Sequence, residues 1–498
     1  MNRAAGSAGL LPGIALATIA QAMDAQMISG LLPTIEGALA LTPDEANALI
    51  IGYLCTNIVV IPISPWLSEY FGRRRYFLMS IAGFGICALL CACCSSFEIL
   101  LALRILQGAF GGGLVATSHA AFRRALPSSH LGISQVAFVG SFIGAPLTFG
   151  PLISGVIYDG NHVWQWMFAV DAILAAVSFL LCWKFFDNGD EGPQYARIDL
   201  VGIVLFSAFA IPLQYVFIEG ARYNWLDDPN ICTLLAASAL SLIALIIWHV
   251  GDNKALFSAA LRLNRNTTVV AILLFFLGLC LSGIVAVAIG FAEQLLDFTA
   301  TLAGAMMVLR GLAFIPLILL VGILMDKKSP RVYVPVAIGI VLIAVGFILQ
   351  WQWTTTDTSF TLEVQALTVS GLGIGPALIP LLWWLFKTVP KSQTLAVTAF
   401  VDTALALGTR SALAVVPTAI DHRFAMHYNQ LSSEITATHL TIVKLAAIPH
   451  SLALLTRLVA QQSYALAFAD IALGLAVIAI ITIPFIALVD HTEAVEEA

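Results

Sequence analysis

Two ionisable residues of opposite charge lie inside separate, otherwise apolar stretches of this sequence. Asp24 is about twelve residues into the stretch 11–33, and Arg104 is about six residues into the stretch 98–120. If both stretches are helices that cross a membrane in opposite directions, a rise of about 1.5 Å per residue puts the two side chains roughly 15 and 10 Å from the same face. A charge inside a bilayer is costly and usually faces the interior of a helix bundle. We therefore expect Asp24 and Arg104 to meet, either as a group that binds and releases protons or as a static ion pair.

The second half of the sequence places three more charges inside apolar stretches. Asp402 lies about ten residues into one of them, Arg410 lies further along the same stretch, and Arg310 lies about seven residues into another. Together with Asp24 and Arg104, these residues are our candidates for proton coupling or substrate contact. Buried structural pairing is the alternative for each of them.

The elements that position these residues follow from the composition. Sixty per cent of the 498 residues are hydrophobic and ten per cent are charged, which no soluble core of this length matches. A bilayer core about 30 Å thick takes roughly 20 apolar residues per helix, and such stretches recur about fourteen times. We predict an all-α polytopic membrane protein with 14 transmembrane helices arranged 6+2+6. The expected spans are 11–33, 46–67, 76–95, 98–120, 131–157 and 167–186, then 199–218 and 231–249, then 268–291, 303–325, 332–351, 363–386, 393–420 and 465–489.

This pattern predicts three structural units. An N-terminal six-helix bundle would occupy 1–190, and a two-helix insert with flanking cytoplasmic linkers would occupy 191–262. A C-terminal six-helix bundle would occupy 263–498 and include a long periplasmic loop at 421–464.

The distribution of Lys and Arg predicts the orientation. With both termini inside, sixteen of the 23 Lys and Arg residues fall in inner loops and tails, and four fall in outer loops. Such a bias is the usual mark of the cytoplasmic side. The net charge of −6 argues against a nucleic-acid partner. The clustered cysteines Cys91, Cys93 and Cys94 have no His or carboxylate among them, so we expect packing residues and no metal site.

A short segment repeats between the two halves of the sequence, in each case after the second helix of a six-helix block. The matched positions are Leu67, Glu69 and Arg74 with Leu324, Asp326 and Arg331, at a constant offset of 257. Internal repeats of this kind build secondary transporters, whose substrates bind near the membrane midplane between the halves.

Four stretches resemble the major facilitator superfamily, and within it the fourteen-helix drug:proton antiporters of the EmrB/QacA type. They are the loop Glu69-Tyr-Phe-Gly72-Arg73-Arg74-Arg75; Arg104-Ile-Leu-Gln107-Gly108 followed by three glycines; Gly144-Ala-Pro146 with Gly150-Pro151-Leu-Ile-Ser154-Gly155; and Met23-Asp24 with Leu32-Pro33-Thr34-Ile35. The chain departs from the family pattern at several positions. Glu69 and Tyr70 stand where the family usually has Asp and Arg, and Ser154 stands where it usually has Gly. Gln165 replaces an Arg, and Asp171 replaces an Asn.

The resemblance implies roles for these motifs. Glu69, Gly72, Arg73 and Arg74 would form a gate at the inner face. Pro146, Gly150, Pro151 and Gly155 would form a hinge that resists proton leak, or else a static kink, because Pro removes a backbone hydrogen bond. Gln107 and Gly108 would accompany Arg104 on the fourth helix.

The same resemblance implies the function. The expected protein is a bacterial inner-membrane antiporter, not an enzyme, that exports small amphipathic or lipophilic compounds by alternating access. It would use the proton gradient and no cofactor, would contact membrane lipid, and could work with a periplasmic adaptor protein. The alternatives are a narrow-specificity metabolite exporter or symporter, or a non-transporting membrane sensor or scaffold on the same fold.

Overall fold

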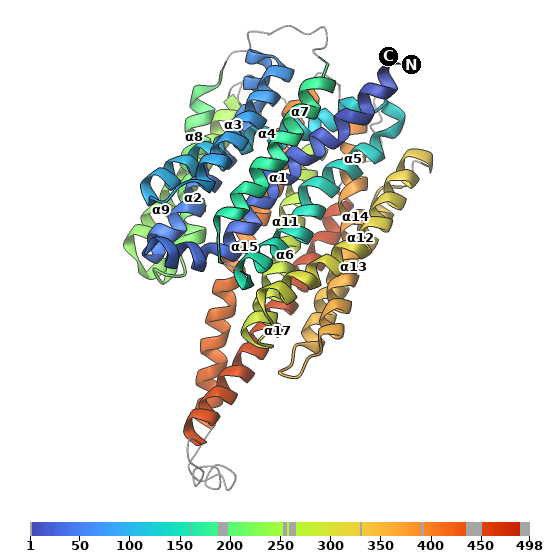
Figure 1. Ribbon diagram of the computed structural model, residues 1–498. Helices are drawn as coiled ribbons and strands as arrows, with labels where there is room; N and C mark the ends of the chain where they lie inside the picture. The colour runs from blue at the N-terminus through green and yellow to red at the C-terminus, as the bar shows by residue number, and fades with distance from the viewer. Residues whose placement is uncertain are drawn as a thin grey trace.

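The computed structural model describes residues 2–160, 162–187, 198–251, 256–257, 265–328, 331–389, 393–434 and 451–488. All of its long elements are helices (Figure 1). The first block comprises α1 (Asn2–Leu39), α2 (Pro43–Phe71), α3 (Arg73–Ala92), α4 (Phe97–Ala125), α5 (Leu131–Val139) continued through η2 (Gly140–Gly144) into α6 (Ala145–Asp159), and α7 (Gln165–Phe185). The insert comprises α8 (Leu200–Glu219) and α9 (Pro229–Gly251). The last block comprises α11 (Arg265–Gln294), α12 (Ala300–Lys328), α13 (Tyr333–Trp353), α14 (Phe360–Thr388), α15 (Thr394–Glu434) and α17 (Ser451–Ile486).

These helices reproduce the expected 6+2+6 order when α5, η2 and α6 are counted as one interrupted span. Thirteen helices among the described residues are long and apolar enough to cross a membrane. The fourteenth helix is α1, in which Gln21, Asp24 and Gln26 lower the hydropathy. The prediction of a fourteen-helix membrane bundle is confirmed. The linkers expected on either side of the insert fall largely outside the described residues, so the three unit boundaries stay predictions.

The fifth span is interrupted by a single wide turn. The residues of η2 form a π-helical turn between α5 and α6, and Pro146 follows within the first turn of α6. Proline has no amide hydrogen to donate, and a π turn is a common way for a helix to accommodate such a loss. Pro151 lies further along α6. The bend expected from the two prolines is therefore located before the first of them.

The first and last blocks meet along a seam in which α5 and α6 pack lengthwise against α12. Glycines on both sides make this approach possible. A Cβ added to Gly155 would overlap the carbonyl oxygen of Ala300, and one added to Gly304 would overlap the backbone of Leu152. Small residues of this kind allow membrane helices to pack backbone to backbone. Gly155 of the predicted hinge motif is thus a packing residue between the blocks.

Carboxylates close this seam at both of its ends. At one end, Asp326 on α12 accepts hydrogen bonds from the backbone amides of Gly132 (2.6 Å) and Ile133 (3.2 Å) at the start of α5. At the other end, Asp159 on α6 accepts one from the amide of Thr301 (2.8 Å) at the start of α12. Each carboxylate satisfies free amides at the N-terminus of a helix in the opposite block and complements the positive end of its dipole.

The segment predicted as a loop at 421–464 is largely helical. Residues 421–434 continue α15, and residues 451–464 begin α17, while 435–450 lie outside the described residues. Figure 1 shows these two helices projecting as a pair beyond the end of the bundle. The ring of Phe424 stacks on Tyr464 with centroids 4.0 Å apart, and Asp470 bonds His427 at 2.9 Å. The expectation of a loop was wrong because a drop in hydropathy marks where the chain leaves the membrane and not where the helix ends. No Gly or Pro follows Pro417 in α15 to end the helix.

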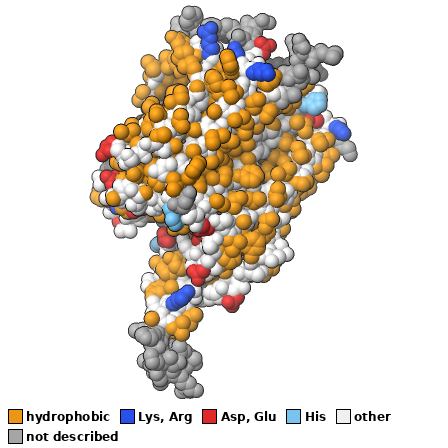
Figure 2. Space-filling view, in the orientation of Figure 1, with side chains coloured by type: hydrophobic (Ala, Val, Ile, Leu, Met, Phe, Trp, Pro, Cys, Tyr) orange, Lys and Arg blue, Asp and Glu red, His pale blue; other side chains and the backbone are white. Residues whose placement is uncertain are grey.

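One end of the bundle is rich in arginine. Arg73, Arg74 and Arg75 start α3 there, and Arg123 and Arg124 end α4. We call this the basic end. Figure 2 shows apolar side chains covering the middle of one face, with Lys and Arg gathered mainly at one end of it. The α15–α17 pair projects from the opposite end.

We predict that the Asp326 cap holds the two blocks together at the basic end. Replacing a capping residue by Ala costs about 0.5–2 kcal/mol, so Asp326→Ala should populate the open basic end roughly fivefold more. A cysteine placed at Ala120, which lines a small cavity at this end, should then react several-fold faster with a soluble maleimide.

Asp199→Ala is the matched control for this change. Asp199 caps the amide of Gly202 within α8 and accepts bonds from Trp248 and Leu256, and within the described residues none of its bonds crosses the seam. Equal acceleration by both substitutions would show that Asp326 has no particular role in closing the basic end.

Candidate functional site

The structure brings Asp24 and Arg104 into direct contact at the centre of the first block. Both side chains are fully buried, and Nη1 of Arg104 lies 2.8 Å from each carboxylate oxygen of Asp24. Gln107 completes the group, because its Oε1 accepts from the same Nη1 at 2.9 Å and its Nε2 donates to Asp24 at 3.3 Å. The depths estimated from the sequence therefore placed the two side chains correctly at the same level of the bundle. Whether the pair couples transport to protons stays a prediction.

A second carboxyl group belongs to this cluster. Asp171 on α7 is fully buried and lies close enough to Asp24 and Arg104 to interact electrostatically with both. Neither of its oxygens receives a hydrogen bond from a donor among the described residues. Two ionised carboxylates beside one guanidinium would leave a net negative charge in a dry interior, which is strongly unfavourable. A proton on one of the two carboxyl groups would remove that charge, which makes the cluster a candidate for carrying a transferable proton.

Asp171 was missed as a site residue in the sequence. The sequence singled it out only as a departure from the family pattern. The signal was present, because an acid four residues into an apolar stretch is by default a functional candidate.

The ring of Tyr53 separates this cluster from the space between the blocks. The guanidinium of Arg104 stacks on the Tyr53 ring, 4.3 Å from its centroid, and the Tyr53 hydroxyl donates to the carbonyl of Gln21 at 2.8 Å. Gly108 allows α4 this close to α2, because an added Cβ would overlap the carbonyl oxygen of Tyr53. Gln107 and Gly108 of the predicted motif therefore bond and position Arg104.

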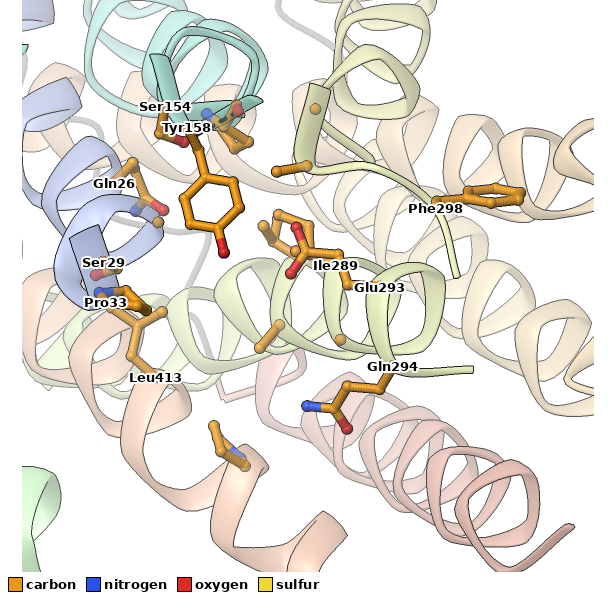
Figure 3. Close-up of a pocket in the computed structure, with 18 of the residues that line it drawn as sticks. Gln26, Ser29, Pro33, Ser154, Tyr158, Ile289, Glu293, Gln294, Phe298 and Leu413 are labelled. Atoms are coloured by element: carbon orange, nitrogen blue, oxygen red, sulfur yellow. Dashed lines mark hydrogen bonds between the residues drawn. The ribbon is translucent and has the colours of Figure 1, made fainter. Parts of the chain in front are cut away.

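Two adjacent cavities lie between the blocks. The larger has a volume of about 680 Å³ and is lined from α1, α6, α11, α12 and α15. Figure 3 shows Tyr158 and Glu293 extending into it. The second cavity is lined by Gln21, Tyr53 and Arg410, among others, and shares Gln26 and Leu413 with the first. The cavities thus lead from the outer part of the bundle to the far side of the Tyr53 ring.

Arg410 and Arg310 have different surroundings. Arg410 on α15 reaches across to α2, where it donates to the carbonyl of Leu54 (3.0 Å) and to the side-chain oxygen of Asn57. Arg310 on α12 is buried, is absent from the lining of both cavities, and has no partner for Nε or Nη2 within the described residues. Of the two candidates, Arg410 is the one placed at a cavity.

Asp402 pairs with a histidine that the sequence analysis did not single out. Nδ1 of His119 on α4 lies 3.0 and 3.1 Å from the two carboxylate oxygens of Asp402, and its Nε2 lies 2.8 Å from the side-chain oxygen of Gln135. Phe138 stacks on the imidazole with centroids 3.6 Å apart. This fully buried group joins the two blocks toward the basic end. His119 could have been found as an ionisable residue within an apolar stretch.

The structure explains the glycine of the inner-loop motif but does not test the gate role expected for its charged residues. Gly72 has φ +84°, a left-handed conformation that favours glycine, and this geometry makes the tight turn from α2 to α3. Arg74 donates to the carbonyl of Trp183 on α7 at 2.5 Å, which is a contact within the first block. Arg73 lines a cavity of about 300 Å³ at the basic end. The gate proposed for Glu69 and these arginines stays a prediction. Asp326, the repeat equivalent of Glu69, makes a contact between the blocks at this end.

The remaining motif residues border the cavities. Pro146 lines the second cavity and Pro151 the first. Gly150 packs on α1, where an added Cβ would lie 2.8 Å from the Cβ of Gln26. This placement fits either a hinge or a static kink, and the choice between them stays open.

Comparisons with known proteins agree with this architecture. The family model described as Major Facilitator Superfamily matches residues 14–410. The multidrug export protein EmrB of Haemophilus influenzae is 27% identical over 424 residues, covering 85% of this chain and 82% of that protein. EmrB of Escherichia coli K12 is 24% identical over 426 residues, with the same shares covered. The proton:xylose symporter XylE shares the fold with a TM-score of 0.56 at 14% identity, covering 95% of each chain. The chain is therefore similar to the EmrB proteins, as its motifs indicated, and belongs to the Major Facilitator Superfamily.

Proposed function

We propose that this transporter is a proton-driven multidrug efflux permease that exports small amphipathic or lipophilic compounds. The observation that carries the proposal is the arrangement around Tyr53. A buried cluster that can hold one proton lies on one side of this ring, and a cavity between the two blocks lies on the other. The export functions named for the EmrB relatives support the same direction of transport.

The cluster has the groups needed to gain and lose a proton. With one proton on the two carboxyl groups, Arg104 balances the remaining negative charge. Nη2 of Arg104 and both oxygens of Asp171 are buried and have no hydrogen-bond partner among the residues that the structure describes. When the proton leaves, this free N–H can move toward the new carboxylate and partly stabilise it. Access of water from one side of the membrane or the other then decides where the proton goes.

The conformation described here corresponds to one state of an alternating cycle. The Asp326 cap and the His119–Asp402 pair join the blocks toward the basic end, while the larger cavity lies toward the other end. In the opposite state these contacts would break and a compound would enter from the basic end. Protons would then move in as the compound moves out.

The proposal includes the location. The basic end would face the cytoplasm of a bacterium, with both termini on that side of the inner membrane, because Lys and Arg are retained there. A membrane potential then contributes about 2.3 kcal/mol per charge per 100 mV, so a single proton can drive a substantial gradient of exported compound without a further cofactor.

Loss of either carboxylate should uncouple transport. We predict that Asp171→Asn and Asp24→Asn each reduce export against a concentration gradient at least tenfold, while exchange of compound down its gradient continues. The amide has the shape of the carboxyl group but cannot release a proton. Transport into everted vesicles under an imposed pH gradient measures the first property, and counterflow measures the second.

Asp227→Asn, in the exposed α8–α9 connection, is the matched control and should pump at the wild-type rate. If both cluster variants also pump normally, the coupling proton belongs elsewhere, and the His119–Asp402 pair is the next group to test. Loss of counterflow in either variant would instead indicate misfolding, which thermal unfolding of the purified protein would reveal.

We also propose that the projecting α15–α17 pair docks an adaptor protein. Met426, Leu454 and Leu458 on this pair are 41%, 52% and 49% exposed, although the pair extends past the apolar middle of the bundle. The double substitution Met426→Asp and Leu458→Asp should abolish co-purification with an adaptor encoded beside the gene. Gln430→Asp, exposed on the same helix, should leave it unchanged. Undiminished capture by the double variant would place the interface elsewhere.

A further inference from the structure

The second cavity is lined by hydrogen-bond donors and apolar groups, and no carboxylate is among its described lining residues. We infer that this cavity binds the anionic group of an amphipathic compound and that Arg410 pairs with that anion. The inference rests on the proposed export function and names the chemical class of one of its substrates.

The charge of Arg410 is unpaired among the described residues. Its two hydrogen-bond acceptors, the carbonyl of Leu54 and the side-chain oxygen of Asn57, are both neutral. A guanidinium has five N–H donors in a planar fork that matches a carboxylate or phosphate. The cation therefore keeps donors for a ligand at the boundary between the blocks.

Two amides add further unused donors. Nε2 of Gln21 and Nδ2 of Asn57 are buried and have no acceptor among the described residues, and both side chains line the cavity. The bond from Arg410 to Asn57 fixes which atom of that amide is the oxygen, so the free atom is a donor. Buried donors without acceptors are unfavourable, and the oxygens of an anion would satisfy them.

The hydrocarbon body of such a compound needs more space than the second cavity has. Its volume is about 80 Å³, and its apolar lining includes Leu54, Val115 and Phe142, so it would take the charged end and the first carbons. The rest of an acyl or aryl chain would extend into the adjoining cavity of about 680 Å³, where Ile289 and Phe468 are part of the lining. Ligand sites of this kind combine a mostly apolar wall with a few placed polar groups that set orientation.

The path outward has the opposite charge. Asp159, Glu293 and Asp421 line the larger cavity that adjoins the second one. An anion is thus attracted at the base and repelled near the mouth, which favours release and disfavours rebinding from outside. Tyr53 links this site to the proton cluster, since it lines the second cavity and its hydroxyl is bonded to the backbone of Gln21.

Binding of three probes with the same chain length tests the inference. The probes are decanoate, decyltrimethylammonium and decanol, with the purified full-length protein in lipid nanodiscs. Arg410→Gln should weaken decanoate binding about tenfold or more, as expected for loss of a charge-assisted contact. Binding of the cation and the alcohol should change less than about twofold.

Two further variants control for damage to the fold. Arg457→Gln removes an arginine that is 68% exposed and should leave decanoate binding unchanged. Arg410→Lys keeps the charge without the planar fork, and its affinity should fall between wild type and Arg410→Gln. If Arg410→Gln leaves decanoate binding unchanged, or weakens all three probes equally, the inference is overturned.

Transport in proteoliposomes separates this inference from the proposed function. Decanoate binding that depends on Arg410, without uphill movement of any compound, would support the anion site and reject the exporter. Uphill export of a lipophilic cation together with decanoate binding that ignores Arg410 would support the exporter and reject the anion site.

Discussion

The need to neutralise an arginine inside the membrane governs the first block of helices. Arg104 has no access to water, so α1 must bring Asp24 to it, and α2 must supply the Tyr53 ring on which it stacks. Breaking such a pair by removing one partner typically costs about 3–5 kcal/mol. Asp171 adds a second acid, so the neutral state of the cluster includes a proton. The need to neutralise buried charge thus agrees with the proton-carrying role that we propose for the cluster.

The two blocks communicate through contacts of different character. Along the α6–α12 side, glycine packing and carboxylate caps keep the backbones close. On the other side, Arg410 and His119 make polar contacts with partners in the opposite block. Packing between backbones tolerates little separation, whereas each polar contact can exchange its partner for water or a ligand. The second set is therefore the one that a compound or a proton can disrupt.

Much of the fold could be predicted from the sequence, because the length of each apolar stretch and the charge of each loop depend only on neighbouring residues. The depth of Asp24 and Arg104 could also be estimated, since the helical rise is constant. The partner of Asp402 could not, because His119 lies on another helix and their contact depends on the rotation of each helix about its axis. The continuation of α15 past residue 420 was missed for a different reason. Hydropathy predicts which part of a helix lies in the membrane, but it does not predict where the helix ends. Arg410 was a candidate from the start, but its lack of a counter-charge becomes visible only when its neighbours are known.

The position of the insert has a mechanical consequence. Helix α8 packs against α2 of the first block and α15 of the last, and Figure 1 shows α8 and α9 on the side of the bundle away from α5 and α12. If the blocks tilt about the glycine seam, the side of the bundle opposite this seam undergoes the largest displacement. The insert connects the two blocks on this side, within the membrane. Its packing against both α2 and α15 would then limit how far the two blocks can separate.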